Sequence, residues 1–447
     1  MKHLSKFSSD QKNTLALVIT LILLTIFYMG SIADVPFHPG ESTYIFMSDD
    51  LKTMFTDLQS MFWQPGQVDD LHQHYRKLDP PTSRAIIGLS RLVADQPSLS
   101  ADWDWSLTWQ ENQQAGALPD PALLTVSRIG IAIFYPFSLL FFHLSVNEMS
   151  GRLTAWLAML FMAGNMLVLL HTRRAMTESF MLFTVILSLY FLVHFREKPW
   201  LSAFPIALAL NAKLSAAPFA AVGGLVILLV AIQKKWPVKK WLGQLAAYGL
   251  ITLLISFILN PFLWAHPVAA AQSAWESRLV LTDRQVATVA EVSPEQVLDS
   301  PLKRIGNLVA HLYFTPPAIA DVANYLEETA QSSERYLAQP LHSLGRGPSA
   351  ASLALILSLV GFLISLLDLI RIKSTPLLIL FLSGLAQTAA ILLLVPLPFQ
   401  RYILPDVPFA CFWLAYGIAK FINGIASAIK QKRSMPQSQH GTRKPTT

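Results

Sequence analysis

The chain has 447 residues, of which 53% are hydrophobic and 14% charged, and its formal net charge is +6. Its apolar runs approach about 20 residues, the length that crosses a bilayer as a helix, so the composition indicates a polytopic, all-α integral membrane protein. The basic residues cluster beside apolar segments, which argues against a nucleic-acid-binding surface. The single cysteine, Cys411, lies within an apolar run, and an internal disulfide is therefore excluded.

Ten membrane spans are predicted from the apolar runs. The first follows Lys2, Lys6 and Lys12 and is too long for the apolar region of a cleaved signal peptide, so we interpret it as a retained anchor. The fifth and sixth are treated as separate spans because Pro205 and Pro218 interrupt an apolar stretch that is too long for one crossing. In chain order, the predicted spans are 15–33, 123–145, 150–170, 178–196, 200–217, 218–233, 242–260, 350–370, 376–396 and 404–428.

The charges of the turns indicate how these spans are oriented. Lys and Arg gather in the turns 196–198, 234–240 and 371–373 and in the C-terminal tail, which the positive-inside rule assigns to the cytoplasm. Loop 34–122 instead holds thirteen acidic residues against five Lys plus Arg, and loop 261–349 holds nine against six. We therefore expect a multi-pass protein of the cell membrane with both termini in the cytoplasm and both large loops on the outer face.

The two large loops do not have the pattern of independent domains. Amphipathic stretches within them predict short helices on the outer membrane surface, at 42–61, 82–93, 268–281 and 301–313. Asp49 and Asp50 fit a solvated face of the first of these. We expect residues 1–428 to form a single transmembrane domain and the basic tail, 429–447, to be disordered.

An acidic residue directly after the first span is a candidate for chemistry. The pair Pro39-Gly40 predicts a turn, after which Glu41 occupies the first turn of a helix, where the helix dipole favours the ionised carboxylate. A carboxylate at the membrane surface can accept a proton from an acceptor hydroxyl. The alternative interpretation is an acid that starts a helix and has no chemical task.

Charged residues near two further span ends are candidates for ligand binding. Arg173, Arg174 and Glu178 lie in the short outer turn between the third and fourth spans. Two arginines there run against the positive-inside bias, which favours an anionic ligand or a carboxylate partner; otherwise the segment only begins a helix. Lys213 falls near the outer end of the fifth span, where it either extends to the interface or contacts a lipid phosphate as a point charge.

The segment 396–405 places Arg401 and Tyr402 directly between two long apolar runs. An arginine at a membrane boundary is costly unless it faces water, a partner or an anionic ligand. Its planar guanidinium also suits a bidentate contact with phosphate, so Arg401 is the strongest candidate for a phosphate site. By contrast, His72 and His74 have a spacing that separates their rings on a helix, and we assign no metal ligands.

The order of these motifs resembles the membrane glycosyltransferases of the GT-C fold, specifically the family of protein O-mannosyltransferases and bacterial aminoarabinose transferases (glycosyltransferase family 39). The resemblance covers nearly the whole chain. In chain order the matching elements are Gly40-Glu41 with Tyr44, Asp79-Pro80-Pro81, Ser127-Arg128, Glu178, Lys213, Asn260-Pro261-Phe262-Leu263-Trp264 and Arg401-Tyr402-Ile403-Leu404-Pro405.

The resemblance implies about ten transmembrane helices with interfacial helices in two large outer loops. It also implies transfer of a sugar from a polyprenyl-phosphate-linked donor to a lipid, glycan or protein acceptor on the outer face. The usual first acid of the family's motif is replaced by Gly40, so we expect Glu41 or Asp34 to be the catalytic acid, unless the chain is impaired in that chemistry. With the charge arguments above, the candidates for substrate binding are Arg401, Tyr402, Lys213, Arg173, Arg174 and Glu178. The sequence leaves open whether a divalent metal ion assists as a cofactor.

Two other classes of function are compatible with the sequence. A lipid or solute transporter would place charges at mid-span and carry paired discontinuous helices. Here the charges gather at one face and the outer loops are large and acidic, which favours the enzyme. A catalytically impaired scaffold homologue is the other alternative, because of Gly40. The expected partners are a lipid-linked donor, an acceptor and membrane lipids, and no nucleic acid.

Overall fold

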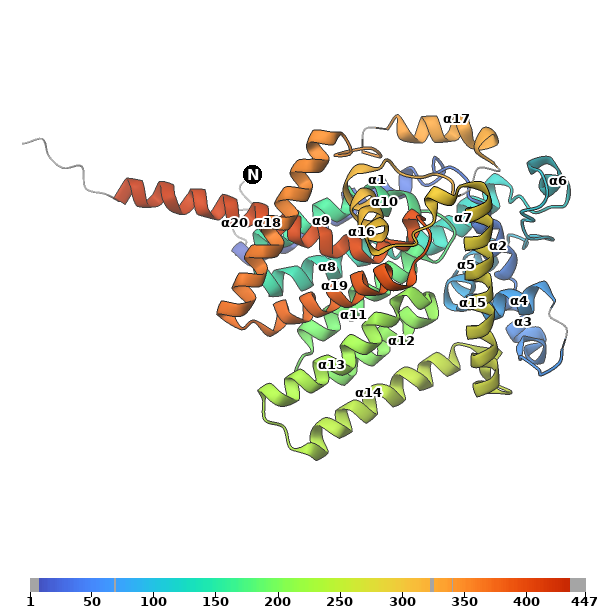
Figure 1. Ribbon diagram of the computed structural model, residues 1–447, viewed down its shortest axis with the longest axis horizontal. Helices are drawn as coiled ribbons and strands as arrows, with labels where there is room; N and C mark the ends of the chain where they lie inside the picture. Colours follow the sequence, from blue (N-terminus) through green and yellow to red (C-terminus); the bar gives the residue numbers. More distant parts are fainter. Residues whose placement is uncertain (1–7, 68–69, 322–324, 340, 435–447) are drawn as a thin grey trace, which may run out of the picture.

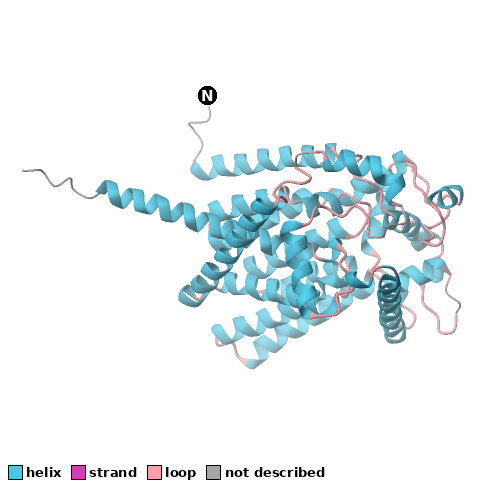
Figure 2. Cartoon of the chain, turned by 45° about the horizontal axis from the view of Figure 1, so that its top comes forward, coloured by secondary structure: helices cyan, strands magenta, loops and turns pink. Residues whose placement is uncertain are grey.

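A computed structural model of the protein describes residues 8–67, 70–321, 325–339 and 341–434. Throughout these residues the chain forms helices and loops and no strand (Figure 2). The first helices are α1 (Ser9–Gly30), α2 (Pro39–Met47), α3 (Asp50–Thr56), α4 (Leu71–Leu78), α5 (Thr82–Val93), α6 (Trp109–Gln114), α7 (Pro121–Ala132), α8 (Tyr135–Ser150), α9 (Arg152–Ala163), α10 (Met166–His171) and α11 (Glu178–His194). The others are α12 (Ala203–Ala212), α13 (Ala217–Gln233), α14 (Val238–Ile258), α15 (Pro267–Val292), α16 (Pro301–Val309), α17 (Leu326–Leu337), α18 (Pro348–Ile372), α19 (Thr375–Leu394) and α20 (Val407–Ser434).

Seven helical segments of the described chain are long and apolar enough to cross a membrane. They are 10–30, 121–150, 214–233, 238–258, 348–372, 375–394 and 404–429. The third, fourth and fifth predicted spans fall on shorter apolar helices, at 152–163, 178–194 and 199–212. The helical, membrane-embedded architecture expected from the sequence is therefore confirmed, although three of the predicted spans are shorter than expected.

Two of these short helices are interrupted for local reasons. After α9, Gly164 ends the helix and Asn165 caps the next one, its side chain accepting hydrogen bonds from the N–H groups of Leu167 and Val168. After α12, Lys213 takes an extended conformation and the short 3-10 helix η4 (Leu214–Ala216) leads into α13. The predicted division of the apolar stretch 200–233 into two segments is thus present, with Lys213 at the break.

The two longest segments between the apolar helices, 31–120 and 259–347, gather at one end of the bundle. Figure 1 shows α2 to α6 and α15 together at its right-hand end, while α13, α14, α19 and α20 extend toward the left. Segments 31–120 and 259–347 are joined there by a hydrogen bond of 3.2 Å from the Trp63 N–H to the Phe262 carbonyl oxygen. We call this end of the molecule the loop end.

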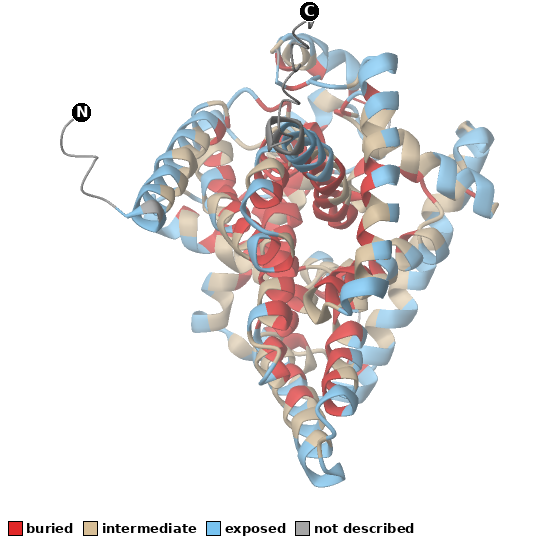
Figure 3. Ribbon diagram, turned by 90° about the vertical axis from the view of Figure 1, so that its left-hand side faces the viewer, coloured by how far each residue is buried: buried red, intermediate tan, exposed pale blue. Residues whose placement is uncertain are grey.

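The core runs through the centre of the bundle. Its buried residues come from helices as far apart in the chain as α1 and α20, among them Tyr28, Phe142, Leu189 and Phe412. Figure 3 shows this buried centre surrounded by exposed helix faces. Apolar side chains on α14 and α18, such as Leu253 and Leu363, are exposed, which fits helices that face lipid.

The interfacial helices predicted in the loops are largely present. Stretch 82–93 coincides with α5, while 42–61 is divided among the end of α2, α3 and the 3-10 helix η2 (Leu58–Met61). α15 extends further than predicted, to Val292, and 301–313 becomes α16 followed by η7 (Ala310–Phe314). At the C-terminus, α20 continues to Ser434, past the predicted start of the disordered tail; the rest of that tail, 435–447, lies outside the described residues.

Candidate active site

Glu41 lies in the first turn of α2, as the sequence predicts, but its carboxylate is already fully engaged. Arg128 of α7 donates two hydrogen bonds to it, each of 2.8 Å, and the Ala175 N–H donates a third of 2.8 Å. The N–H of His38, which caps the helix, donates a fourth of 3.1 Å. Burial alone would raise the pKa of Glu41, but the charge and hydrogen bonds of Arg128 outweigh it and hold the pKa below its ordinary value. Glu41 is thus a buried, ionised anchor between α2, α7 and the turn before α11.

Asp34, the other predicted catalytic acid, is exposed at the loop end. It accepts a hydrogen bond of 3.3 Å from Gln339 Nε2. This partner belongs neither to the group that binds Glu41 nor to the group around Arg401. The catalytic roles assigned to Glu41 and Asp34 from the sequence stay predictions, and the two residues occupy very different environments.

Lys213 and Glu178, predicted separately, lie in direct contact. The Lys213 ammonium is 2.7 Å from Glu178 Oε1, which ties the break between α12 and α13 to the first residue of α11. The ammonium also lies 5.3 Å from the centre of the Tyr402 ring, within the range of a cation–π contact. Three of the predicted substrate-binding residues therefore share one location.

Arg401 completes this group through an acid that the sequence analysis did not identify. It lies in the 3-10 helix η8 (Gln400–Tyr402), and its guanidinium carbon is 5.5 Å from the centre of the Tyr402 ring. Its Nη2 is 3.1 Å from Asp321 Oδ2. The same oxygen is 3.1 Å from His38 Nε2. Arg401 is therefore linked to the start of α2 through Asp321.

The protonation of this linkage follows from its geometry. His38 Nδ1 accepts a hydrogen bond of 3.0 Å from the Gly40 N–H, so the proton of the neutral ring is on Nε2 and is donated to Asp321. Burial lowers the pKa of His38. Burial would raise the pKa of Asp321, yet the charge of Arg401 holds it well below its usual range. Asp321 is therefore a carboxylate and His38 a neutral donor at neutral pH.

Arg173 and Arg174 are fully buried rather than open to a ligand. Arg173 Nη1 is 3.1 Å from His342 Nε2, and its guanidinium lies 4.8 Å from the centre of the Tyr28 ring. Arg174 Nη2 donates to the carbonyl oxygen of Ile319 at 2.5 Å. Within the described residues neither arginine has a carboxylate within 4 Å, although the charge of Arg174 acts on Glu41 and Asp321.

The charged residues that surround Glu41, Glu178 and Asp321 do not balance in sign. In this group, within the described chain, the cations Arg128, Arg173, Arg174, Lys213 and Arg401 outnumber these three carboxylates by two. In addition, six buried polar atoms of this group and the adjacent His171 lack a hydrogen-bond partner among the described residues: Glu178 Oε2, Arg401 Nε, His171 Nε2, Arg173 Nε and Nη2, and Arg174 Nε. Buried polar groups are normally hydrogen-bonded, so both features suit a polar, anionic ligand.

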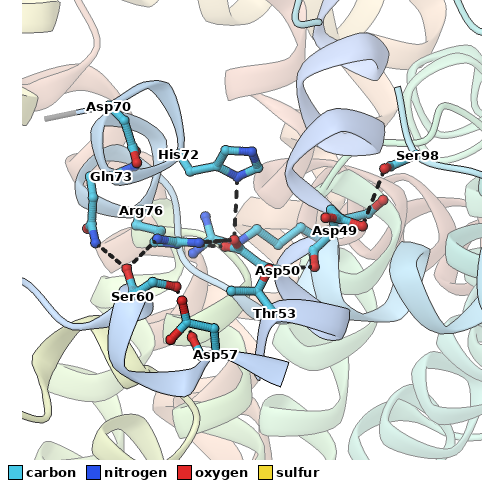
Figure 4. Close-up of polar contacts among 12 residues, drawn as sticks. Asp49, Asp50, Thr53, Asp57, Ser60, Asp70, His72, Gln73, Arg76 and Ser98 are labelled. Carbon is cyan, nitrogen blue, oxygen red and sulfur yellow. Dashed lines mark hydrogen bonds and ion pairs between the residues drawn. The ribbon is translucent and has the colours of Figure 1, made fainter. Parts of the chain in front are cut away.

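Asp50, Arg76 and Arg84 form a second cluster of charges, and the prediction that Asp50 lies on a solvated helix face is wrong. Asp50 is not on a solvated face: its side chain is 5% exposed and accepts hydrogen bonds from Arg76 Nη2 at 2.5 Å and Nε at 3.1 Å (Figure 4). Arg84 Nε lies 3.1 Å from the other carboxylate oxygen. The cluster joins α3, α4 and α5. Asp50 is buried because α4 and α5 cover the face of α3 that the sequence pattern assigned to water. Asp49, by contrast, is 39% exposed.

The described residues contain no group of three or more His, Cys, Asp or Glu side chains arranged to hold a metal ion. His72 lies against Asp50, with Nδ1 3.6 Å from the carboxylate, and its role is that of a neighbour in the arginine cluster. Whether a divalent metal ion assists stays open, as it was from the sequence.

Comparison with known proteins relates the fold to one group of enzymes. No protein-family model and no curated protein sequence matches the chain. Oligosaccharyltransferase AglB from Archaeoglobus fulgidus, solved with an inhibitory peptide and a dolichol-phosphate, matches with a TM-score of 0.52 and 11% identity, over 98% of this chain and 53% of that chain. The apo form of the Archaeoglobus fulgidus oligosaccharyltransferase gives a TM-score of 0.50 and 13% identity, over 94% and 52% of the two chains. ArnT from Cupriavidus metallidurans bound to undecaprenyl phosphate gives 0.48 and 10%, over 94% and 63%.

The chain therefore spans about half the length of the oligosaccharyltransferases that it matches. At this level of identity the similarity shows the fold, which is that of the GT-C membrane glycosyltransferases. The fold class expected from the sequence is confirmed, and the likeness extends over nearly the whole chain.

Proposed function

We propose that this protein is an integral membrane glycosyltransferase that transfers a sugar from a polyprenyl-phosphate-linked donor to a lipid, glycan or protein acceptor. The observation that carries the proposal is the convergence of Lys213, Arg401 and Tyr402 at the loop end of a GT-C fold. The excess of buried positive charge around them suits the phosphate of the leaving group. A related fold was solved with dolichol-phosphate, which belongs to the proposed class of lipid carrier.

The proposed reaction is a single displacement. The acceptor hydroxyl oxygen attacks the anomeric carbon, the bond from that carbon to the phosphate oxygen breaks, and polyprenyl phosphate leaves with the electron pair. Arg401 and Lys213 stabilise the charge that develops on the phosphate. The hydroxyl proton passes to a carboxylate, and the configuration at the anomeric carbon is inverted.

Two carboxylates compete for the role of proton acceptor in this scheme. Glu41 is the sequence-based candidate, but four hydrogen bonds engage its oxygens. Asp321 is 7% exposed and bound to Arg401, so it lies beside the proposed phosphate site. When the phosphate of the leaving group binds Arg401, Asp321 loses its strongest counter-charge and becomes more basic. We therefore favour Asp321 as the base and Glu41 as a positioning residue.

The orientation proposed from the charges places the loop end outside the cell and both termini in the cytoplasm. A lipid-linked sugar would then reach the site from the outer leaflet, along the exposed apolar faces of the bundle. The transporter alternative requires passage of a solute through the bundle instead. Among the described residues the charged cluster lies at the loop end, which gives that alternative less support.

Binding of decaprenyl phosphate to the purified, reconstituted protein tests the proposal. Charged hydrogen bonds contribute about 1.5–3 kcal/mol, so Arg401→Ala should weaken binding about 10-fold to 150-fold, at about 1.4 kcal/mol per decade. Lys213→Gln should weaken it in the same direction. Lys420→Gln is the matched control, because Lys420 also pairs with an acid, Asp368, at 2.7 Å, but far along α20. Unchanged affinity in both Arg401→Ala and Lys213→Gln would overturn the proposal.

Release of polyprenyl phosphate from a lipid-linked sugar donor separates the enzyme from an impaired scaffold. Asp321→Asn should abolish release while decaprenyl phosphate still binds. If the wild-type protein binds the lipid but releases none, and Gly40→Asp restores release, the scaffold interpretation holds. The Cβ of a residue at position 40 would lie 2.8 Å from the end of the flexible Met176 side chain and 3.1 Å from His38 Nδ1, so this substitution requires both side chains to shift.

A further inference from the structure

A cavity lies in the bundle, and none of its lining residues belongs to the candidate active site. It has a volume of about 260 Å³ and is enclosed by α9, α10, α18 and α20 together with η7. Its walls are mostly apolar, with Gly164, Leu312, Ala354, Ala410 and Leu414 among them. Leu160 and Leu344, which also line it, are 45% and 60% exposed, so the cavity has an apolar rim on the surface of a membrane-embedded bundle.

Among the residues that the structure describes, Arg346 is the only positively charged side chain that lines this cavity, and it lies just before α18. Its Nη1 donates a hydrogen bond of 2.9 Å to the carbonyl oxygen of His311. In the described part of the chain, no carboxylate lies within 4 Å of it, unlike Arg128 and Arg76 at the loop end. Burial lowers the pKa of Arg346 to about 10, so the side chain is still a cation at neutral pH. A partly buried cation without a counter-ion calls for an anion.

The beginning of α18 adds to the attraction for an anion at the same place. Pro348 is its first residue, and the preceding Gly347 provides no side-chain cap. Pro348 has no N–H and the Ala351 N–H donates to the Gly347 carbonyl, so the N–H groups of this turn that can bind an anion are those of Ser349 and Ala350. The helix dipole also favours negative charge there. Ala350, in this first turn, lines the cavity beside Arg346. Arg346 and the first turn of α18 therefore provide positive charge beside the apolar cavity.

We propose that this cavity is a binding site for one anionic phospholipid of the surrounding bilayer. The phosphate binds Arg346 and the first turn of α18, and part of one acyl chain occupies the apolar cavity. The volume is slightly below the range of roughly 300–1,000 Å³ typical of small-molecule sites, which suits a chain that is only partly enclosed and continues past Leu160 into the bilayer. This proposal depends on the membrane location of the chain and not on glycosyl transfer.

Lipid retention after extraction from a bilayer tests the site. The full-length protein is reconstituted in vesicles of phosphatidylcholine with one-fifth phosphatidylglycerol, extracted in mild detergent and examined by native mass spectrometry. The wild-type protein should retain one phosphatidylglycerol in preference to phosphatidylcholine. Arg346→Gln should reduce retention on the order of 10-fold, and Ala354→Phe, which fills the cavity, should reduce it as well.

Arg304→Gln is the matched control. Arg304 also donates to backbone carbonyl oxygens, those of Leu298, Leu392 and Leu393, but it does not line the cavity. Its substitution should leave retention of phosphatidylglycerol unchanged. Thermal unfolding of each variant verifies that the extracted protein is folded, and Ala354→Phe provides an answer should Arg346→Gln fail to fold.

Three results would overturn the proposal. The first is retention of phosphatidylglycerol at the wild-type level by both Arg346→Gln and Ala354→Phe. The second is equal retention of the two lipids by the wild-type protein. The third is that decaprenyl phosphate displaces phosphatidylglycerol and that Arg346→Gln weakens the binding of decaprenyl phosphate. The cavity would then be part of the donor site. Lys213→Gln distinguishes the two proposals. If this variant loses decaprenyl phosphate binding but retains phosphatidylglycerol normally, the two lipids bind at separate sites. If decaprenyl phosphate binding is unchanged in both Lys213→Gln and Arg401→Ala, the proposed function fails while the phospholipid site stands.

Discussion

Arg128 and Glu41 form a bidentate ion pair with two hydrogen bonds of 2.8 Å, in a place where both side chains are no more than 1% exposed. The pair joins the helix that follows the first apolar segment to α7. A buried ion pair of this kind contributes little net stability compared with apolar residues, but removal of one partner leaves an uncompensated charge. The ion pair is therefore needed to hold α2 against α7, next to the candidate active site.

We predict that Glu41→Gln lowers the stability of the protein. Breaking a buried ion pair costs about 3–5 kcal/mol, since Arg128 would have no counter-ion. Thermal unfolding in detergent, followed by tryptophan fluorescence, should show a lower midpoint for Glu41→Gln. Asp34→Asn should leave the midpoint nearly unchanged, because Asp34 is exposed. A Glu41→Gln variant with normal stability and no transfer would instead favour the sequence-based assignment of Glu41 as the catalytic base.

The contact between Lys213 and Glu178 should be visible as an energetic coupling. Lys213→Met leaves Glu178, which is 1% exposed, without its ion-pair partner, and the free energy of unfolding should fall by about 3–5 kcal/mol. The double variant Lys213→Met/Glu178→Met removes both charges and should be more stable than Lys213→Met alone. Additive effects of the two single substitutions would show that the residues do not interact in the folded protein.

The Asp50 cluster should make stability depend on pH in the acid range. Burial would raise the pKa of Asp50, but Arg84, His72 and Arg76 hold it below the ordinary value. A carboxylate with a depressed pKa contributes stability above its unfolded pKa, about 3.9, and that contribution is lost as the pH falls toward the folded pKa. The difference in unfolding midpoint between wild type and Asp50→Asn should therefore be constant from pH 8 to about 5 and shrink below about 4. An equal difference at pH 7 and pH 3 would contradict this.

The proposed orientation can be tested by labelling single cysteines on a Cys411→Ala background. Pro237→Cys lies in the turn between α13 and α14 among four lysines and should react with a membrane-impermeant thiol reagent only after the cells are opened. Trp105→Cys is the matched site at the loop end, where the native side chain is 47% exposed, and it should react in intact cells. Labelling of position 237 from outside would reverse the orientation.

The parts of the fold that follow from local pattern were predictable from the sequence. Apolar length located the membrane-embedded segments, and amphipathic spacing located α5 at Thr82–Val93. Lys213 and Glu178 were both assigned to the outer ends of their spans, and they lie in direct contact. Such assignments depend only on the position of a residue along its own span.

Contacts between distant segments were not predictable in this way. His38 and Asp321 are 283 residues apart in the chain, and nothing in the pattern of either segment refers to the other. Asp50 looked solvated because local sequence does not reveal that α4 and α5 fold over α3. The burial of Arg173 and Arg174 was missed for the same reason: their partners, His342 and the Ile319 carbonyl, lie in the second large loop.

That last arrangement has a consequence for how the protein is made. The ribosome delivers Arg173 and Arg174 to the membrane well before residues 319 and 342 are synthesised, so the nascent chain must keep both guanidinium groups hydrated in the interval. A chain truncated after α14 would keep the Glu41–Arg128 pair but lack every partner that the second loop supplies. Premature termination should therefore yield a protein that inserts its first helices yet leaves Arg173 and Arg174 without their partners from the second loop.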